Sequence, residues 1–158
     1  MAFVRHKGKT KIMYFKGDTA EEIRAGALVM LNDSASLSRV RNDSTNDKII
    51  GVARRNDTVT DSALVPVEVP VESAVEWLID VDSDAGAVDS SVGRFVTVDT
   101  EGGNSVPAGD SGSVRVDISD SGSATVATSV FITGVVSTTK VIGVIAHTAF
   151  HQTYDTAQ

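Results

Sequence analysis

Apolar residues occupy every second position between residues 65 and 81, with one exception, and this alternation constrains the fold more than any other stretch of the chain. The positions between them are mostly acidic residues or proline. Because strand side chains alternate between the two faces of a sheet, the pattern predicts one apolar face and one largely acidic face. It is too long for one ordinary strand, so we expect two strands with a break near Ser73 and Ala74. The only tryptophan, Trp77, falls on the apolar face and is expected in the core.

Two prolines, Pro66 and Pro70, lie in the first of these strands. Each removes a backbone N–H from the hydrogen-bonding ladder, and prolines within sheets are confined to edges, strand ends and bulges. We therefore expect residues 65–71 at a sheet edge or at a boundary between subunits.

The composition indicates an all-β protein. The chain of 158 residues contains 24 valines and 5 leucines, and β-branched residues favour strands. This length is enough for one sizeable core or for two small lobes that share one. We expect a small barrel or sandwich-like β domain over residues 19–150, with sub-units at 19–64 and 65–150 if it is divided, and a polar tail over 151–158.

Several classes of protein are disfavoured by what the chain lacks. It has no cysteine, so it has neither disulfides nor thiolate metal sites. No apolar run approaches the roughly 20 residues that span a bilayer. No apolar segment follows the basic residues at the N-terminus, so we do not expect a secretory signal. A soluble protein synthesised in the cytoplasm is the expectation.

Charge is distributed unevenly along the chain. Five of the 14 basic residues lie before the first acidic residue, Asp18, and the remainder carries nine basic against 21 acidic residues, a formal charge of −12. Such an acidic body repels nucleic acid and anionic lipid, so we expect neither as a partner. Residues 1–18 are predicted to form an extended basic arm. It is either a frayed terminus with a first strand or an arm that docks on a partner, with nucleic-acid contact the weakest alternative.

A repeat is visible in two pairs of segments. Gly26-Ala27-Leu28-Val29 leads to Lys48-Ile49-Ile50-Gly51-Val52, and Gly93-Arg94-Phe95-Val96 leads to Lys140-Val141-Ile142-Gly143-Val144. Two small β units, or one barrel made of both, would explain it, and chance similarity between short strings is the alternative. The glycine inside each closing strand predicts a bulge or a close backbone approach.

No motif argues for an enzyme. Residues 109–113, Gly-Asp-Ser-Gly-Ser, are similar to the nucleophile signature of chymotrypsin-like proteases, but the only histidine before Ser111 is His6, and the Asp-Ser-Gly-Ser string recurs ten residues later. Turn formation explains both strings. The acidic loop 80–86 resembles the start of a calcium loop, but its glycine is one place late and no acid stands at the twelfth position, so we expect an acidic turn and assign no metal site, with opportunistic Ca²⁺ binding as the alternative.

A resemblance to a known family is carried by five segments: Gly26-Ala27-Leu28-Val29, Ile49-Ile50-Gly51-Val52-Ala53, Val75-Glu76-Trp77, Phe131-Ile132-Thr133-Gly134-Val135 and Lys140-Val141-Ile142-Gly143-Val144. With the polar loops between them they resemble the small β-rich capsid decoration proteins, or cement proteins, of tailed bacteriophages. The likeness extends over about residues 21–146.

The resemblance implies a protein without enzymatic activity or cofactor that binds the outside of the mature head and bridges major capsid subunits. It implies a homotrimer located on the virion exterior after synthesis in the host cytoplasm. Shell contacts are then expected from Arg5, Lys7, Lys9, Lys11 and Lys16, with Tyr14 and Phe15 as anchors. A protomer interface is expected at Val65, Pro66, Val67, Val69 and Pro70.

A different virion part is the alternative, such as a head fibre or tail component that binds a host glycan or a tail partner. A glycan site needs an aromatic platform, and apart from the phenylalanines the chain offers Trp77, Tyr14 and Tyr154.

Overall fold

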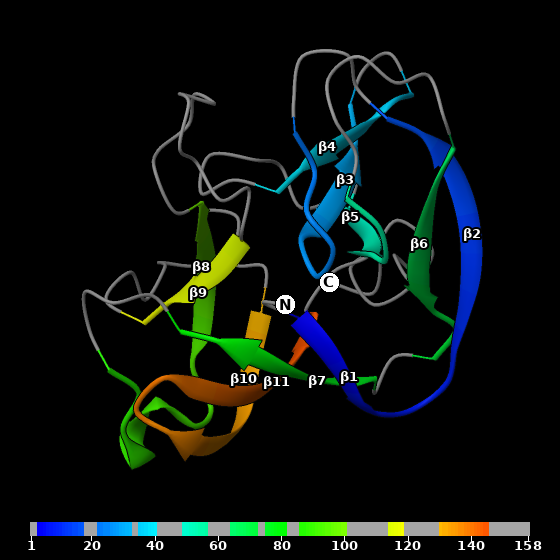
Figure 1. The fold of residues 1–158 in the computed structure, drawn as a ribbon. Helices are drawn as coiled ribbons and strands as arrows, with labels where there is room; N and C mark the ends of the chain where they lie inside the picture. The colour runs from blue at the N-terminus through cyan, green and yellow to red at the C-terminus, as the bar shows by residue number, and fades with distance from the viewer. Residues whose placement is uncertain are drawn as a thin grey trace, which may run out of the picture.

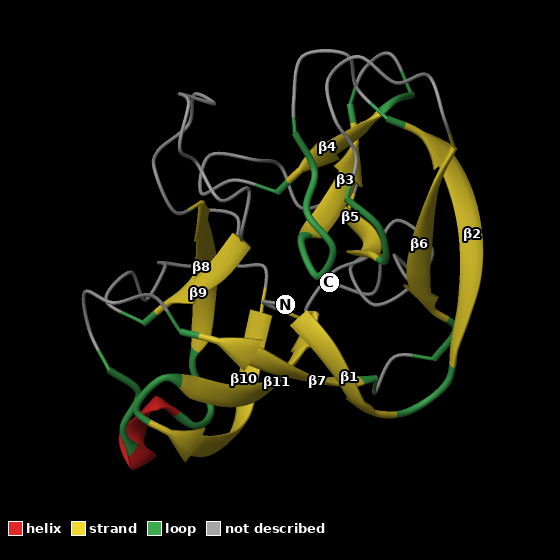
Figure 2. Ribbon diagram, viewed as in Figure 1, coloured by secondary structure: helices red, strands yellow, loops and turns green. Residues whose placement is uncertain are grey.

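The computed structural model describes residues 3–17, 22–32, 35–40, 49–56, 64–72, 75–81, 86–100, 114–118 and 130–145. Within these residues the protein is nearly all β, as predicted, and the helical element is the short 3₁₀ turn η2 (Asp89–Ser91). The strands form two antiparallel sheets in a sandwich-like arrangement (Figures 1 and 2).

One sheet has six strands in the order β1-β7-β11-β10-β8-β9. Their bounds are β1 (Phe3–Lys7), β7 (Glu76–Asp80), β8 (Phe95–Thr100), β9 (Val114–Asp117), β10 (Val130–Ser137) and β11 (Lys140–Ile145). The other has five strands in the order β2-β6-β5-β3-β4. Their bounds are β2 (Thr10–Lys16), β3 (Leu28–Leu31), β4 (Leu37–Arg39), β5 (Ile49–Ala53) and β6 (Leu64–Pro70).

Neither sheet closes into a barrel, although each curls toward closure. In the five-stranded sheet an isolated bridge joins Gly17, just beyond β2, to Leu37 in β4. In the six-stranded sheet a similar bridge joins Val81, just beyond β7, to Val116 in β9. The sandwich form of the prediction is therefore confirmed, and the barrel form is wrong, because each of these contacts is a single bridge and not a ladder.

Two hydrophobic cores follow from this curl. The larger core lies between the sheets and contains Trp77, as predicted, with residues of both sheets such as Phe3, Leu28 and Val130. The smaller core is lined by the five-stranded sheet itself and includes Ile50 and Val67. Strand β5 is buried on both sides because it contributes to both cores, with Ile49 and Val52 in the larger one and Ile50 and Ala53 in the smaller one. An extra residue opposite β3 lets Ile49 and Val52 share one face.

The predicted break in the central stretch is confirmed, since β6 ends at Pro70 and β7 begins at Glu76. These two strands belong to different sheets, and the N-terminal strands pair with them, β1 with β7 and β2 with β6. Phe3–Lys7 pairs with β7, and Thr10–Lys16 pairs with β6 from Thr10↔Pro70 to Lys16↔Leu64. Together the four strands form one long antiparallel ribbon, bent at Gly8 and Lys9, that joins the two sheets (Figure 1).

This ribbon corrects the expectation of an N-terminal arm. Residues 3–16 are extended, but they are paired along their length and supply core side chains, with Phe3 in the larger core and Met13 and Phe15 against the smaller one. Gly8 allows the bend, because its φ is +102° and a Cβ there would lie 2.9 Å from the Cα of Val75.

The position predicted for the prolines is also wrong. Strand β6 lies between β2 and β5, so it is an interior strand. The prolines are tolerated because the β5–β6 ladder has only two residue pairs, Val52↔Glu68 and Ala53↔Val67. The carbonyl of Pro66 accepts a hydrogen bond from Arg54 N (2.9 Å), so its backbone faces β5 just where that strand ends. The missing N–H of proline therefore falls outside the ladder.

The predicted repeat exists in the strand order, but with a different correspondence. Four successive strands are arranged as β6-β5-β3-β4 in one sheet and as β11-β10-β8-β9 in the other. Reading both in chain order equates β5 with β10, whereas the sequence comparison equated β5 with β11. The short Lys-Ile-Gly-Val strings are similar for a local reason, since both strands need a glycine where a neighbour comes close.

That close approach is confirmed at both glycines. A Cβ on Gly51 would lie 2.2 Å from the carbonyl oxygen of Glu68, and a Cβ on Gly143 would lie 2.7 Å from Cγ1 of Val130. Gly143 is paired with Trp77 across β11 and β7. The absent side chain lets Val130 and Ile79 pack directly against the backbone of β11.

Replacing Gly143 with alanine should destabilise the fold by about 1–3 kcal/mol, because the added methyl overpacks a filled core. Gly134→Ala in the neighbouring strand is the matched control, since its Cβ would meet Ile142 only at 3.7 Å. The control should be neutral or more stable by up to about 1 kcal/mol. Urea unfolding of both variants measures the difference, and equal stabilities would contradict the packing that we describe for Gly143.

Candidate functional site

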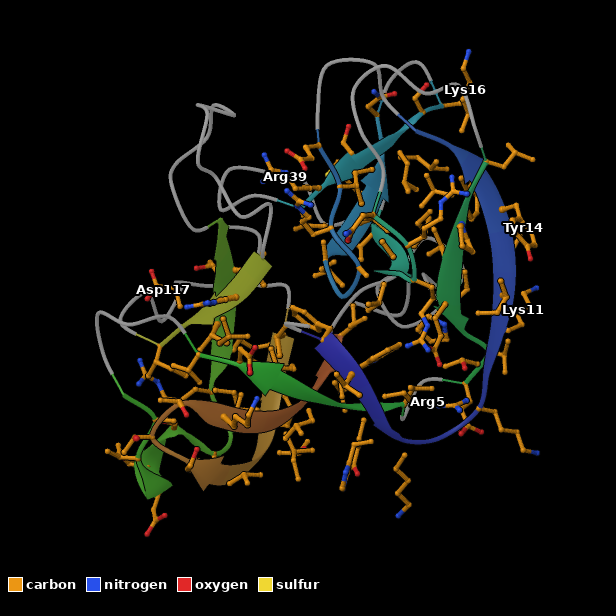
Figure 3. The ribbon with its side chains drawn as sticks, in the orientation of Figure 1. Arg5, Lys11, Tyr14, Lys16, Arg39 and Asp117 are labelled. Atoms are coloured by element: carbon orange, nitrogen blue, oxygen red, sulfur yellow. The ribbon has the colours of Figure 1, made fainter. Side chains whose placement is uncertain are left out.

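The basic residues predicted to contact a partner gather on β1, β2 and the bend between them. Lys7, Lys9, Lys11 and Lys16 are all exposed. Figure 3 shows Lys11, Tyr14 and Lys16 along the outer side of β2, with Arg5 nearer the corner between β1 and β2. We use the name β2 surface for Lys9, Lys11, Ile12, Tyr14 and Lys16.

Alternation along β2 separates its aromatic residues. Tyr14 and Ile12 share the outer face and are 64% and 48% exposed, which is high for large side chains in a strand. Phe15 points to the opposite face and packs against the smaller core. Tyr14 is therefore available to a partner, whereas Phe15, predicted as a second anchor, is held in the fold.

Arg5 has a partner within the chain, the carboxylate of Glu68. Its Nε lies 3.3 Å from Oε1, and NH1 of Arg54 lies 3.1 Å from Oε2 of the same carboxylate. Thr10 Oγ1 donates to Oε1 at 2.7 Å and accepts from NH1 of Arg5 at 2.8 Å. The Glu68 side chain is only 5% exposed, so its charge is removed from most water and compensated by two guanidinium groups.

Sequence reasoning missed this network. The alternating pattern assigned Glu68 to an acidic outer face, and β6 indeed turns Glu68 away from the apolar Val67 and Val69. What buries it is the pairing with β2 on one side and β5 on the other, together with Arg5 from β1. No local pattern reports those neighbours. The signal available in the sequence was the single acid between two prolines in an otherwise valine-rich strand.

The predicted protomer interface lies inside the fold. Val65, Val67 and Val69 are fully buried in the smaller core, Pro70 is buried and Pro66 is half-buried. The valines are committed to their own chain, because they pack in the smaller core and β6 is paired with β2 and β5. The structure therefore gives no support for an interface between copies at these residues.

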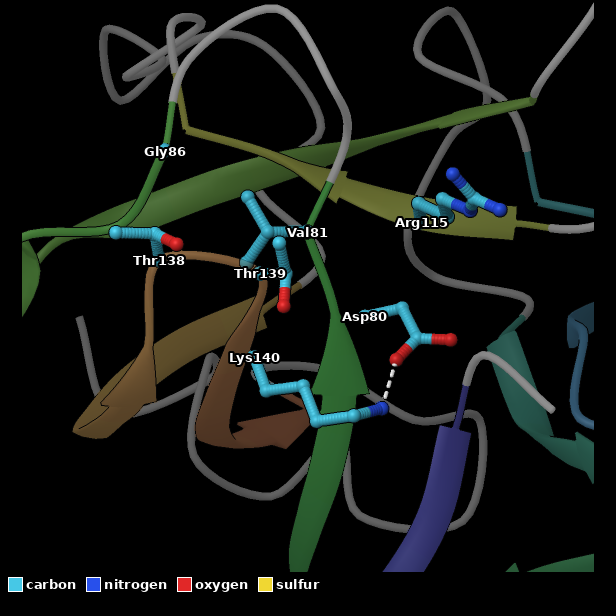
Figure 4. Close-up of a pocket in the computed structure, with 7 residues that line it drawn as sticks. All are labelled: Asp80, Val81, Gly86, Arg115, Thr138, Thr139 and Lys140. Atoms are coloured by element: carbon cyan, nitrogen blue, oxygen red, sulfur yellow. Dashed lines mark hydrogen bonds and ion pairs between the residues drawn. The ribbon is translucent and has the colours of Figure 1, made fainter.

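A pocket of about 440 Å³ opens at one end of the six-stranded sheet (Figure 4). Its charged lining residues are Asp80, Arg115 and Lys140, and Asp80 and Lys140 form an ion pair with each other. The turn at Thr138 and Thr139 forms another wall, where the Thr139 carbonyl accepts from Val81 N at 2.9 Å. The ion pair between Asp80 and Lys140 compensates two of the three charged residues in this lining.

The other sequence candidates receive no structural support as sites. The residues that the structure describes contain no group of three His, Cys, Asp or Glu that could hold a metal ion. Of the acidic loop 80–86, Asp80 is bound to Lys140, and Asp82 and Asp84 lie outside the described residues, as do Ser111 and Tyr154. Trp77 is fully buried, so its ring cannot serve as a stacking platform.

The Arg5–Glu68 contact should show energetic coupling in a double-mutant cycle of Arg5→Ala and Glu68→Ala. We expect a coupling of about 1 kcal/mol in the free energy of unfolding, since a buried carboxylate gains more from a partner than an exposed one. The more exposed pair Asp80 and Lys140 is the control, with an expected coupling of about 0.2–1 kcal/mol. A coupling free energy of zero between Arg5 and Glu68 would show that their contact does not contribute to stability.

Within the described residues there is no helix with the length and apolar character needed to cross a membrane. Comparison of the chain with protein-family models, with curated proteins and with solved structures gives no match.

Proposed function

We propose that this protein is a structural component of a tailed bacteriophage head that docks through its β2 surface on the outside of the mature shell and stabilises it by bridging major capsid subunits. The resemblance to decoration proteins supports the class of protein. A ligand that binds only the assembled lattice stabilises that lattice by mass action, so no catalytic site is required.

The observation that carries the proposal is the combination of charge and exposed apolar area on one strand. The β2 surface joins three exposed lysines to Tyr14 and Ile12, whereas the chain from Asp18 onward is acidic. Aromatic side chains with a polar tip are enriched where protein interfaces have most of their binding energy, and surrounding charges steer the encounter. An acidic body beneath a basic strip also orients the molecule, because only the strip is attracted to an anionic surface.

A homotrimer remains part of the proposal, with no contact between copies assigned. Light scattering on the purified protein should give a mass near three times that of the chain. A strict monomer at high concentration would contradict a trimer that forms in solution, and trimers could then form only on the capsid surface.

A head fibre or tail component that binds a glycan is the second candidate, and no specific observation favours it. Of the aromatic residues considered for such a platform, Trp77 is buried and Tyr14 is exposed. One tyrosine on a basic strand suits a protein surface better than a stacked sugar.

Charge reversal tests the docking surface. Lys9→Glu combined with Lys16→Glu should weaken binding to heads that lack the protein by at least about tenfold and should flatten its dependence on salt, because rim charges act mainly on the encounter rate. Arg94→Glu is the control, since Arg94 follows η2 closely in the chain and the helix lies far from β2 (Figure 2). Undiminished binding by the double variant, measured by co-sedimentation with heads, would remove the β2 surface from the proposal.

Truncation of Tyr14 tests the apolar part of the same surface. Tyr14→Ala should cost about 2 kcal/mol of binding, roughly 30-fold in affinity, if the ring is buried against the shell. Val136→Ala is the control, because Val136 is also exposed, at 57%, but belongs to β10 in the other sheet. A loss shared by both variants would indicate a general effect on the fold. Deleting residues 1–16 is not a usable test, since it removes two paired strands.

A further inference from the structure

The two sheets have four edge strands among the described residues, and β2 differs from the other three. Strands β4 and β9 are only three and four residues long, and β1 has a register shift between Arg5 and Lys7. Natural proteins protect edges in these ways, by shortness and by bulges. Strand β2 has seven residues and pairs with β6 without a register shift. It is the long, regular edge of this fold, and it lies on the outside with β6 on its inner side (Figure 1). Strand β4 approaches it only beyond its end, where Gly17 bridges Leu37.

The direction of the backbone groups in β2 follows from the bonds of its neighbours. In an antiparallel ladder the N–H and C=O of one residue point to the same side, and successive residues alternate. Pro66 faces β5, because its carbonyl accepts from Arg54 N, so Val65, Val67 and Val69 face β2. Their partners in β2 are Phe15, Met13 and Lys11.

Ile12 and Tyr14 therefore direct their backbone N–H and C=O groups away from β6, toward the open side of the edge. The bond from Val71 N to the carbonyl of Lys9 (3.1 Å) continues the same alternation beyond the end of the strand. The residues that carry or neighbour these outward backbone groups include Lys11, Ile12, Tyr14 and Lys16, whose side chains are exposed. Main-chain donors, apolar side chains and lysines thus coincide on one seven-residue edge.

We propose that an extended acidic segment of the shell protein adds to β2 as a further strand, hydrogen-bonded to the backbone of Ile12 and Tyr14. Main-chain bonds then supply affinity, while Lys9, Lys11 and Lys16 select carboxylates and disfavour a second copy of β2, which would bring like charges together. The proposed function supplies the identity of the partner. The mode of contact rests on the edge geometry alone.

The test uses the full chain and a capped seven-residue peptide of alternating glutamate and valine. At millimolar peptide, hydrogen exchange at the amides of Ile12 and Tyr14 should slow at least tenfold, and the inward amides of Lys11, Met13 and Phe15 should change little. A peptide with lysine in place of glutamate should give no added protection. Absence of protection with the acidic peptide, or protection spread evenly over β2, would overturn strand addition.

Paired variants separate main-chain from side-chain contact. Ile12→Pro removes an outward N–H without removing a bond to β6, and Ile12→Ala removes the side chain but keeps that N–H. We expect the proline variant to bind the peptide at least tenfold more weakly than the alanine variant, at similar thermal stability. Equal binding by the two would mean that side chains alone make the contact.

The two proposals fail separately. If the peptide has no effect while Lys9→Glu with Lys16→Glu still abolishes head binding, docking stands and strand addition is wrong. If the peptide protects Ile12 and Tyr14 while the charge variant binds heads normally, the edge is a strand acceptor and its partner is not the shell.

Discussion

The bent ribbon formed by residues 3–16 and the strands β6 and β7 is the constraint on which the two sheets depend. One half of the ribbon contributes to each sheet, and the corner between the halves must cover the carboxylate of Glu68. Two arginines and a threonine hydroxyl do so from three different elements. A buried charge tolerates little displacement of its partners, so the network defines how β1, β2 and the end of β5 meet.

The pairing of β1 and β2 within this ribbon explains how a protein that is acidic from Asp18 onward presents exposed lysines in an ordered position. The first strands contribute to both cores, which places Lys11 and Lys16 on a paired strand and Lys9 directly before it, instead of on a loose terminus. Arg5 is drawn into the structure by Glu68, and Lys11 and Lys16 are exposed on the same strand as Tyr14. A docking surface built on a paired strand loses less conformational entropy on binding than a flexible arm.

Much of the fold could be predicted because its signals are local. The alternation identified β6 and β7, the break between them and the place of Trp77, and the isolated glycines in β5 and β11 indicated close approaches that the structure contains. The candidate surface was predicted less well. Lys9, Lys11, Tyr14 and Lys16 are exposed, but Phe15 packs against the smaller core and the β6 valines, also named as contacts, lie within it. A pattern of period two reports that a residue faces an apolar side, and it does not report whether that side is covered by the same chain.

The sequence by itself determined the class of fold, the alternation of faces and the uneven charge, because each follows from neighbouring residues. Only the tertiary structure decided that β6 is interior, that Glu68 is buried and that β2 is a long open edge. Those properties depend on which strands become neighbours, and strand neighbours are chosen by the packing of side chains that lie some 60 residues apart, as Thr10 and Pro70 do.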